Sequence, residues 1–240
     1  MQFNNYSFFK NKETQILIFL ISLSFLIRIP VVLIYGDTNL EYEWKTLVGN
    51  LIEYKKLGWK NCEFSYSITK FCLKDGFILP NLWMPPLYAY YLYFFTLLNL
   101  TQENYLTLIL FSQVLFASIS VAIFYKINKI FFSEKLSLFS SLLFSFFPLH
   151  VYASSQISSI SIQVFLTILF FYFFFQFLKR KNFFPLFFLS FVAGLLILLR
   201  GEFYAILILS LFFLFFLKIK IKKILLIILI SSITVSPYLI

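Results

Sequence analysis

Apolar runs long enough to cross a lipid bilayer recur along the whole 240-residue chain, and they restrict its fold more than any other feature. Hydrophobic residues make up 61% of the chain and charged residues only 12%, and the mean hydropathy is +0.89. Backbone polar groups inside lipid must pair within the protein, so spanning segments are helices or strands of a closed barrel. Because strand-like alternation is absent, the sequence predicts an all-α integral membrane protein.

The first apolar run, Thr14 to Ile34, predicts a helix that is retained. It is longer than a signal-peptide core and lacks a cleavage site of small residues. Six further runs predict the remaining spanning helices, at residues 104–125, 136–153, 160–178, 184–199, 203–217 and 224–240. The chain is therefore expected to form one membrane domain over residues 1–240 with about seven transmembrane helices. Its parts are a cytoplasmic tail and first helix (1–34), a long extracytoplasmic loop bearing juxtamembrane helices (35–103) and six further helices (104–240).

The distribution of lysines predicts the orientation. Lys10 and Lys12 precede the first helix, and basic residues crowd three later turns, at 126–135, 179–181 and 218–223. The aromatic run 85–100 has only about 16 residues, against roughly 20 needed to cross a bilayer. If it does not cross, all three turns lie in the cytoplasm with the N-terminus, as the positive-inside rule requires. The net charge of +10 then reflects orientation and not nucleic-acid binding.

The densest group of carboxylates directly follows the first apolar run. Asp37, Glu41, Glu43 and Glu53 are four of the ten acidic residues in the chain. A carboxylate at the mouth of a membrane helix can take a proton from an acceptor hydroxyl, which makes Asp37 the first candidate for a general base and Glu41 the second. The alternatives are a helix-start role for Asp37 and a capping role for Glu41.

The same loop predicts an amphipathic helix lying in the membrane interface. Its apolar residues at helical spacing are Leu40, Trp44, Leu47, Val48 and Leu51. Thr38 and Glu41 fit the ends of a capping box at its start, and Gly58 suits its C-terminal end.

Three more charged residues are candidates. Arg200 and Glu202 fall in a predicted outer turn, where arginine suits a phosphate ligand because its planar fork can contact two oxygens. They could instead be a pair that ends two helices. Arg28 lies inside the first helix, where it either faces a cavity or extends to the interface.

Cys62 and Cys72 share the outer loop and either pair or remain free thiols.

The order of these features resembles the GT-C glycosyltransferases, and more narrowly the branch with the protein O-mannosyltransferases and the lipid A aminoarabinose transferase. The matching elements, in chain order, are Arg28, Gly36-Asp37, Pro85-Pro86-Leu87-Tyr88, Gln113, Pro148, Gly194 to Arg200, and Ser236-Pro237-Tyr238. The match covers most of the chain. Relatives are about twice this long, which is consistent with a fragment comprising an N-terminal membrane module.

The resemblance implies a transferase that takes a sugar from a polyprenyl-phosphate donor and passes it to a lipid, glycan or protein acceptor on the extracytoplasmic face, in a bacterial plasma membrane. Asp37 would be the catalytic base, and Arg200, Glu202, Arg28 and Tyr88 would line the donor site. Many relatives carry a second acid after the position of Pro148, where this chain has serines, so the resemblance leaves a divalent metal open.

The rival class is a non-enzymatic membrane protein, such as a flippase, a transporter subunit or an inactive relative. Transporters tend to carry internal repeats and helices interrupted at the bilayer midplane. The sequence has neither, and its acids gather in a loop. A Gly-rich phosphate loop is also absent, which disfavours a nucleotide-sugar donor.

Overall fold

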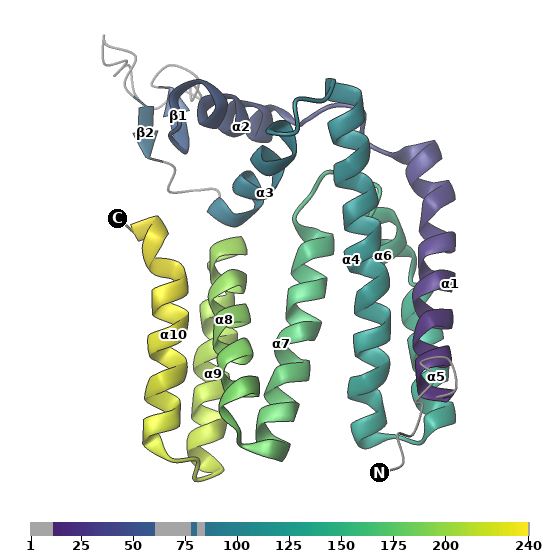
Figure 1. The fold of residues 1–240 in the computed structure, drawn as a ribbon, viewed down its shortest axis with the longest axis vertical. Helices are drawn as coiled ribbons and strands as arrows, with labels where there is room; N and C mark the ends of the chain where they lie inside the picture. Colours follow the sequence, from purple (N-terminus) through teal and green to yellow (C-terminus); the bar gives the residue numbers. More distant parts are fainter. Residues whose placement is uncertain (1–11, 61–77, 81–84, 240) are drawn as a thin grey trace, which may run out of the picture.

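The computed structural model describes residues 12–60, 78–80 and 85–239 (Figure 1). Cys62 and Cys72 lie outside the described residues. The described residues form helices and one short antiparallel strand pair: α1 (Lys12–Tyr35), α2 (Tyr42–Tyr54), β1 (Gly58–Lys60), β2 (Ile78–Pro80), α3 (Pro86–Thr96), α4 (Gln102–Phe131), α5 (Glu134–Ser145), α6 (Pro148–Ala153), α7 (Ile160–Arg180), α8 (Phe183–Leu199), α9 (Phe203–Phe216) and α10 (Ile221–Leu239).

The long helices stand side by side, and the chain reverses direction at each turn (Figure 1). α4 packs between α1 and α7, α7 packs on α8, and α8 packs on α10. The turns that follow α4, α7 and α9 lie at the same end of the bundle as the start of α1. The small elements α2, α3, β1 and β2 lie at the opposite end, beside the end of α1 and the C-terminus (Figure 1). The segment after α1 that carries Asp37, Glu41 and Glu43 is called the acidic loop below. The lysine-rich turns and the acidic loop therefore occupy opposite ends of the bundle.

Four described helices are long and apolar enough to cross a membrane: α1, α4, α7 and α10. α8 and α9 are apolar but have only 17 and 14 residues. α3 has 11 residues, or about 16 Å of helix, which is far short of a bilayer core of about 30 Å. The prediction of an integral membrane protein is thus confirmed. The number of seven crossings stays a prediction, as does the side of the membrane on which each end lies.

The predicted helix 136–153 is interrupted. α5 ends at Ser145, and α6 begins at Pro148. Proline disfavours helical geometry in the residue before it, and Phe147 is extended, with φ −61° and ψ 115°. Proline also needs no hydrogen-bond acceptor at the first helical position, so it starts α6. The expectation of one continuous helix here was wrong because Pro148 was placed within it.

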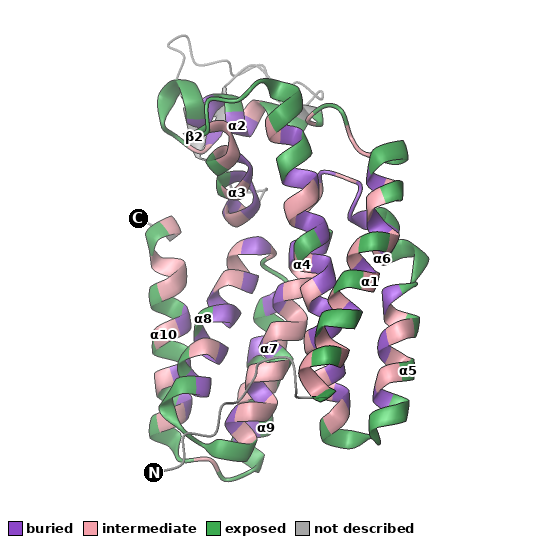
Figure 2. Ribbon diagram, turned by 45° about the vertical axis from the view of Figure 1, so that its right-hand side comes forward, coloured by how far each residue is buried: buried purple, intermediate pink, exposed green. Residues whose placement is uncertain are grey.

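The outer surface of the bundle carries many large apolar side chains, unlike the surface of a water-soluble protein. Many Leu, Ile and Phe side chains are exposed, including Phe139, Leu209 and Phe216 at 58%, 68% and 77%. Exposed residues occur along the length of helices such as α1, α5 and α10 (Figure 2). Between the helices lie buried serines such as Ser141 and Ser190, whose hydroxyls donate to the carbonyl four residues earlier. Small residues at the contacts between helices and large apolar residues on the outer surface are typical of helices packed within lipid.

The amphipathic helix of the outer loop is confirmed, with different ends. Trp44, Leu47, Val48 and Leu51 of α2 are buried, as their spacing predicts. The helix begins at Tyr42, and Glu41 occupies its N-cap without a side-chain cap hydrogen bond, so the predicted capping box was wrong. It ends at Tyr54, before Gly58, because Lys55 adopts the left-handed conformation (φ 56°) that closes a helix. Asn50 then fixes the chain reversal by donating to the Gly58 carbonyl at 2.8 Å.

Candidate functional site

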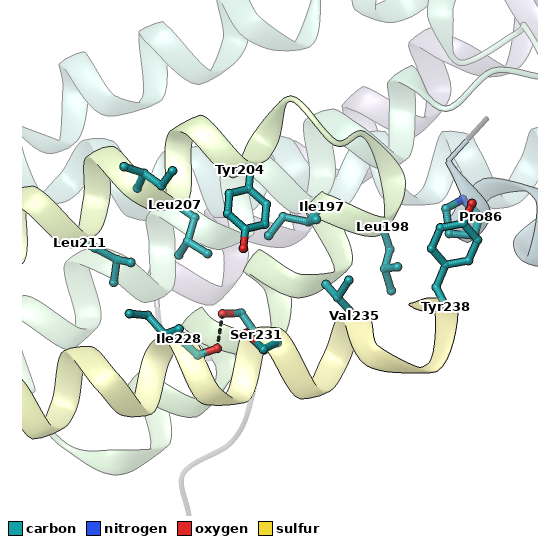
Figure 3. A pocket seen from close by; sticks show the side chains of 12 residues that line it. Pro86, Ile197, Leu198, Tyr204, Leu207, Leu211, Ile228, Ser231, Val235 and Tyr238 are labelled. Atoms are coloured by element: carbon teal, nitrogen blue, oxygen red, sulfur yellow. Dashed lines mark hydrogen bonds between the residues drawn. The ribbon is translucent and has the colours of Figure 1, made fainter. Parts of the chain in front are cut away.

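An apolar cavity of about 490 Å³ lies between α8, α9, α10 and the start of α3 (Figure 3). Leu207 and Leu211 of α9 face Ile228 and Val235 of α10 across it. Other lining residues include Pro86, Leu198, Tyr204 and Tyr238. Ser231 also lines it, but its hydroxyl is bound to the carbonyls of Ile227 and Ile228 at 2.7 and 3.1 Å. The cavity therefore offers a hydrocarbon wall with few free polar groups.

The close approach of α8 and α10 beside this cavity depends on Gly194. A Cβ atom at this position would lie 2.5 Å from the Thr234 Cβ and 3.0 Å from the Ser231 carbonyl oxygen. Contacts this short do not occur, so any larger residue has to separate the two helices. Small residues at helix interfaces allow such close packing inside membranes.

Arg200 and Glu202 lie in the turn between α8 and α9, next to the cavity residues Leu198 and Tyr204. The guanidinium and the carboxylate form an ion pair at 3.1 Å, and their side chains are 42% and 67% exposed. An exposed pair of this kind contributes little to stability. This ion pair is the one that the alternative interpretation of the turn describes. The guanidinium keeps further donors for another ligand, and its role as a phosphate ligand stays a prediction.

Asp37 is held by two contacts with the turn that follows α6. Its carboxylate Oδ2 accepts the backbone N–H of Ile157 at 2.7 Å, and its own N–H donates to the Ser155 carbonyl at 3.1 Å. Gly36 makes this exit from α1 feasible, because its N–H closes on the Val32 carbonyl at 2.9 Å and a Cβ there would lie 2.3 Å from that oxygen. Asp37 thus joins the first helix to a segment 120 residues later.

A second cavity, of about 520 Å³, opens beside Asp37 between the end of α1 and the start of α4. Its polar lining comprises Asp37, Thr38, Asn39, Gln102, Glu103 and Thr107. Sequence reasoning missed Glu103. An acid in the first turn of a helix is common because it complements the helix dipole, so its sequence position gave no signal of a site. The structure places Glu103 across the cavity from the Asp37 loop.

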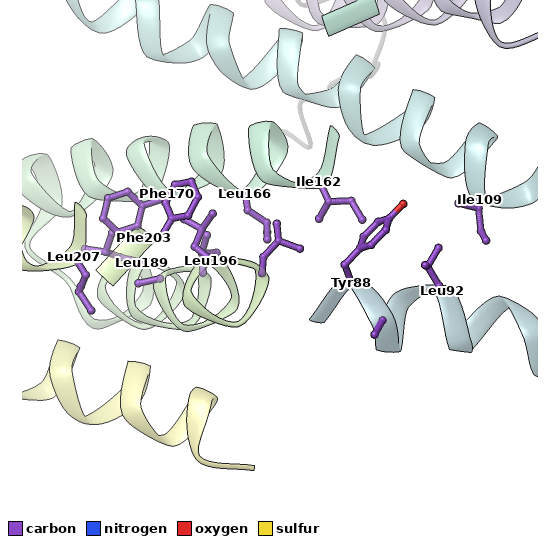
Figure 4. Packing of buried hydrophobic residues seen from close by; sticks show 14 of the residues in the cluster. Tyr88, Leu92, Ile109, Ile162, Leu166, Phe170, Leu189, Leu196, Phe203 and Leu207 are labelled. Carbon is purple, nitrogen blue, oxygen red and sulfur yellow. The ribbon is translucent and has the colours of Figure 1, made fainter. Parts of the chain in front are cut away.

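Tyr88 belongs to the main hydrophobic core and lies between Ile162 and Leu92 (Figure 4). Its ring contacts Trp44 edge-on, with centroids 4.8 Å apart, and stacks on Tyr91 at 5.6 Å. The side chain is fully buried, and burial raises the pKa of the Tyr88 hydroxyl well above its usual value. The nearby charges of Asp37 and Glu41 raise the pKa further. The phenol therefore stays protonated at neutral pH.

Gln113 of α4 connects Tyr88 to the turn that holds Asp37. We orient its amide so that the nitrogen donates to the carbonyls of Gln156 and Ser158, both at 3.1 Å. The amide oxygen then faces the Tyr88 hydroxyl, which has no other partner among the described residues. Gln156 in turn donates to the Tyr35 carbonyl at 3.1 Å. A chain of hydrogen bonds thus links α4, the turn after α6 and the end of α1, with Tyr88 of α3 beside it.

Arg28 lies elsewhere in the bundle. It is buried, with 1% of its surface exposed, so the alternative of a side chain extending to the interface was wrong. One guanidinium nitrogen donates to the Ser24 carbonyl at 3.0 Å, to the Ser24 hydroxyl and to the Ser145 carbonyl at 3.3 Å. Arg28 also lines a cavity of only about 10 Å³ with His150, which has room for roughly one water molecule.

The structure therefore groups the predicted residues into three places. Asp37, Glu41 and Tyr88 lie together at the acidic loop, and Arg200 and Glu202 lie beside the apolar cavity. Arg28 is packed against α5, about two helical turns before the end of α1. α3 stands between the first two places, because it contacts both α4 and α8. Among the described residues, no three His, Cys, Asp or Glu side chains are placed to hold one metal ion.

Comparison with protein families gives a match. A family model described as dolichyl-phosphate-mannose-protein mannosyltransferase matches residues 84–240, well over half of the chain. The match includes Tyr88, Arg200 and Glu202, and it begins after Asp37 and Glu41. A search of curated proteins found no significant match.

Proposed function

Because the chain belongs to the dolichyl-phosphate-mannose-protein mannosyltransferase family, we propose that it transfers a sugar from a polyprenyl-phosphate donor to a hydroxyl acceptor on the extracytoplasmic face of the membrane. Family membership confirms the resemblance to GT-C glycosyltransferases and makes the chain a membrane glycosyltransferase. The donor, the acceptor, the face of the membrane and the residue roles below are the proposal.

The observation that carries the proposal is the position of Asp37. Its carboxylate is fixed by the Ile157 N–H at 2.7 Å and lies on the wall of the polar cavity. Only one carboxylate oxygen is used in this bond, so the other is available to accept a proton from an acceptor hydroxyl in the cavity. The volume of about 520 Å³ suits a sugar or a short peptide segment.

Glu103 and the polar side chains near it would hold the acceptor. Hydroxyl groups of a sugar or a serine can donate to the Glu103 carboxylate and accept from the Gln102 amide, both of which line the cavity. The two carboxylates that line the cavity would have different roles: Asp37 takes the proton, and Glu103 positions the acceptor.

The apolar cavity would take the first isoprene units of the donor. Its wall of leucine, isoleucine and valine matches a hydrocarbon chain. Arg200, in the turn above it, would contact the donor phosphate, while Glu202 holds the guanidinium in place. Pro86 lines the apolar cavity, and Tyr88, two residues later, contacts Trp44 of α2 and lies near the charge of Asp37, so the start of α3 would carry the donor toward Asp37.

In the reaction, the acceptor oxygen attacks the anomeric carbon of the sugar, and Asp37 removes the proton of that hydroxyl. The bond between the anomeric carbon and the phosphate oxygen breaks with inversion, and polyprenyl phosphate leaves. Arg200 stabilises the negative charge that develops on the leaving phosphate. The protonated Tyr88 is a hydrogen-bond donor beside the base and keeps the loop in position through Gln113.

The test is sugar transfer by the purified protein in liposomes, with polyprenyl-phosphate mannose and other polyprenyl-phosphate sugars as donors. We expect wild type to release polyprenyl phosphate, and Asp37→Asn to lower the rate by about 10² to 10⁴-fold, the range for a lost general base. The matched control is Glu43→Gln, which neutralises an exposed carboxylate on α2 outside the cavity. If Asp37→Asn and Glu43→Gln are equally active, Asp37 is not the base.

A further inference from the structure

The end of the bundle opposite Asp37 contains a cavity of about 810 Å³ between α4, α7 and α9. Its cationic lining residues are Lys126 and Lys129 of α4 and Lys179 of α7. Glu13 also lines the cavity, and Tyr172 and Gln176 add a hydroxyl and an amide. The remaining wall is apolar and is formed by Ile130, Phe131, Phe175, Leu178 and Phe213. The cavity thus combines positive charge with aromatic hydrocarbon surface.

Two of the three lysines have no carboxylate partner within the described residues. Lys129 forms an ion pair with Glu13 at 3.0 Å, and Lys12 pairs with Glu134 at 2.6 Å. These two acids are the only ones at this end of the described structure, and both are already paired. Lys126 and Lys179 therefore leave the cavity with net positive charge.

The apolar wall distinguishes this site from one for a small soluble anion. Phe131 and Phe213 line the cavity and are also 57% and 50% exposed on the outer surface, where acyl chains would pass. A molecule with a phosphate group and an attached hydrocarbon chain would satisfy the lysines and the rings together. Basic cavities between membrane helices bind anionic lipid head groups in this way.

We propose that this cavity binds the phosphate of one anionic phospholipid from the adjacent leaflet, with Lys126 and Lys179 as its ligands and the aromatic rings along its acyl chain. The site is separate from the proposed transfer site, which lies at the other end of the bundle (Figure 1). It does not depend on the transfer reaction and holds whichever donor the enzyme uses.

The experiment measures lipid binding by the full chain in phosphatidylcholine nanodiscs that contain a rising fraction of phosphatidylglycerol. Binding is read as the rise in unfolding temperature and as lipid retained per chain by native mass spectrometry. We expect wild type to retain one phosphatidylglycerol, and Lys126→Gln/Lys179→Gln to bind it roughly 30-fold more weakly, as expected for two lysines near a phosphate. Inorganic phosphate at the same concentration should not stabilise wild type.

The matched control is Lys220→Gln/Lys222→Gln, which removes the same charge from exposed positions at the same end but outside the cavity. Equal weakening in the two double variants would show general surface attraction and overturn the site. Stabilisation by inorganic phosphate as strong as that by phosphatidylglycerol would overturn the lipid as ligand. The comparison of the two lipids and phosphate on wild type needs no variant, so it decides the proposal even if a variant folds poorly.

Discussion

Replacing Asp37 with alanine would separate the anchoring role of this residue from its chemistry. The carboxylate accepts the Ile157 N–H at 2.7 Å, and Ile157 is only 2% exposed. Alanine leaves that N–H without an acceptor, whereas asparagine still offers an oxygen. A hydrogen bond to a charged group contributes about 1.5–3 kcal/mol, which is the loss in unfolding free energy that we expect for Asp37→Ala.

Thermal unfolding in one detergent measures this difference. For a chain of this size, each kcal/mol shifts the midpoint by about 2–4 °C, so Asp37→Ala should unfold roughly 3–12 °C below wild type. Asp37→Asn should unfold near wild type although both variants lose transfer activity. Glu43→Ala is the control, because its exposed side chain lies outside the contact. An Asp37→Ala protein as stable as wild type would show that the contact with Ile157 does not anchor the loop.

Three further predictions concern the donor, the helix packing and the topology. Arg200→Ala should weaken donor binding more than Arg200→Lys, because lysine still offsets the phosphate charge and alanine does not. Equal donor affinities of the two variants in a lipid-binding titration would remove Arg200 from the donor site. Gly194→Val should lower the unfolding temperature and the donor affinity together, since its side chain would overlap Thr234 and separate α8 from α10; unchanged values would contradict the 2.5 Å approach. Cysteines placed at 60 and 102, in a chain freed of its two native cysteines, should both react with an impermeant reagent added outside, and protection at 102 alone would mean that 85–100 crosses the membrane.

Local periodicity explains the parts of the fold that the sequence predicts well. The buried face of α2 follows from the spacing of Trp44, Leu47, Val48 and Leu51, because residues three or four positions apart share one side of a helix. Helix ends are harder to predict, since several residues can close a helix. Lys55 ends α2 in place of Gly58, and the capping box at Thr38 does not form.

The candidate site depends on contacts between residues far apart in the chain. Asp37 was predicted from its place after the first helix, but its bond to Ile157 joins positions 120 residues apart. Glu103 becomes a candidate only when α4 packs beside the Asp37 loop. A single sequence carries no signal for such contacts, because they arise from how helices pack and not from the spacing of residues.

Arg28 has a consequence for how the protein enters the membrane during synthesis. Inserting an arginine at the centre of a membrane helix costs about 2.5–3.5 kcal/mol, which is an upper bound for Arg28 near the end of α1, and the Leu, Ile, Val and Phe residues of α1 offset it. The Ser145 carbonyl that Arg28 contacts is 117 residues later in the chain, so it is synthesised well after α1. Ser24, on the same helix, accepts hydrogen bonds from the guanidinium from the outset. The docking of α5 then completes the contacts of Arg28, which ties the position of the first helix to the arrival of a later one.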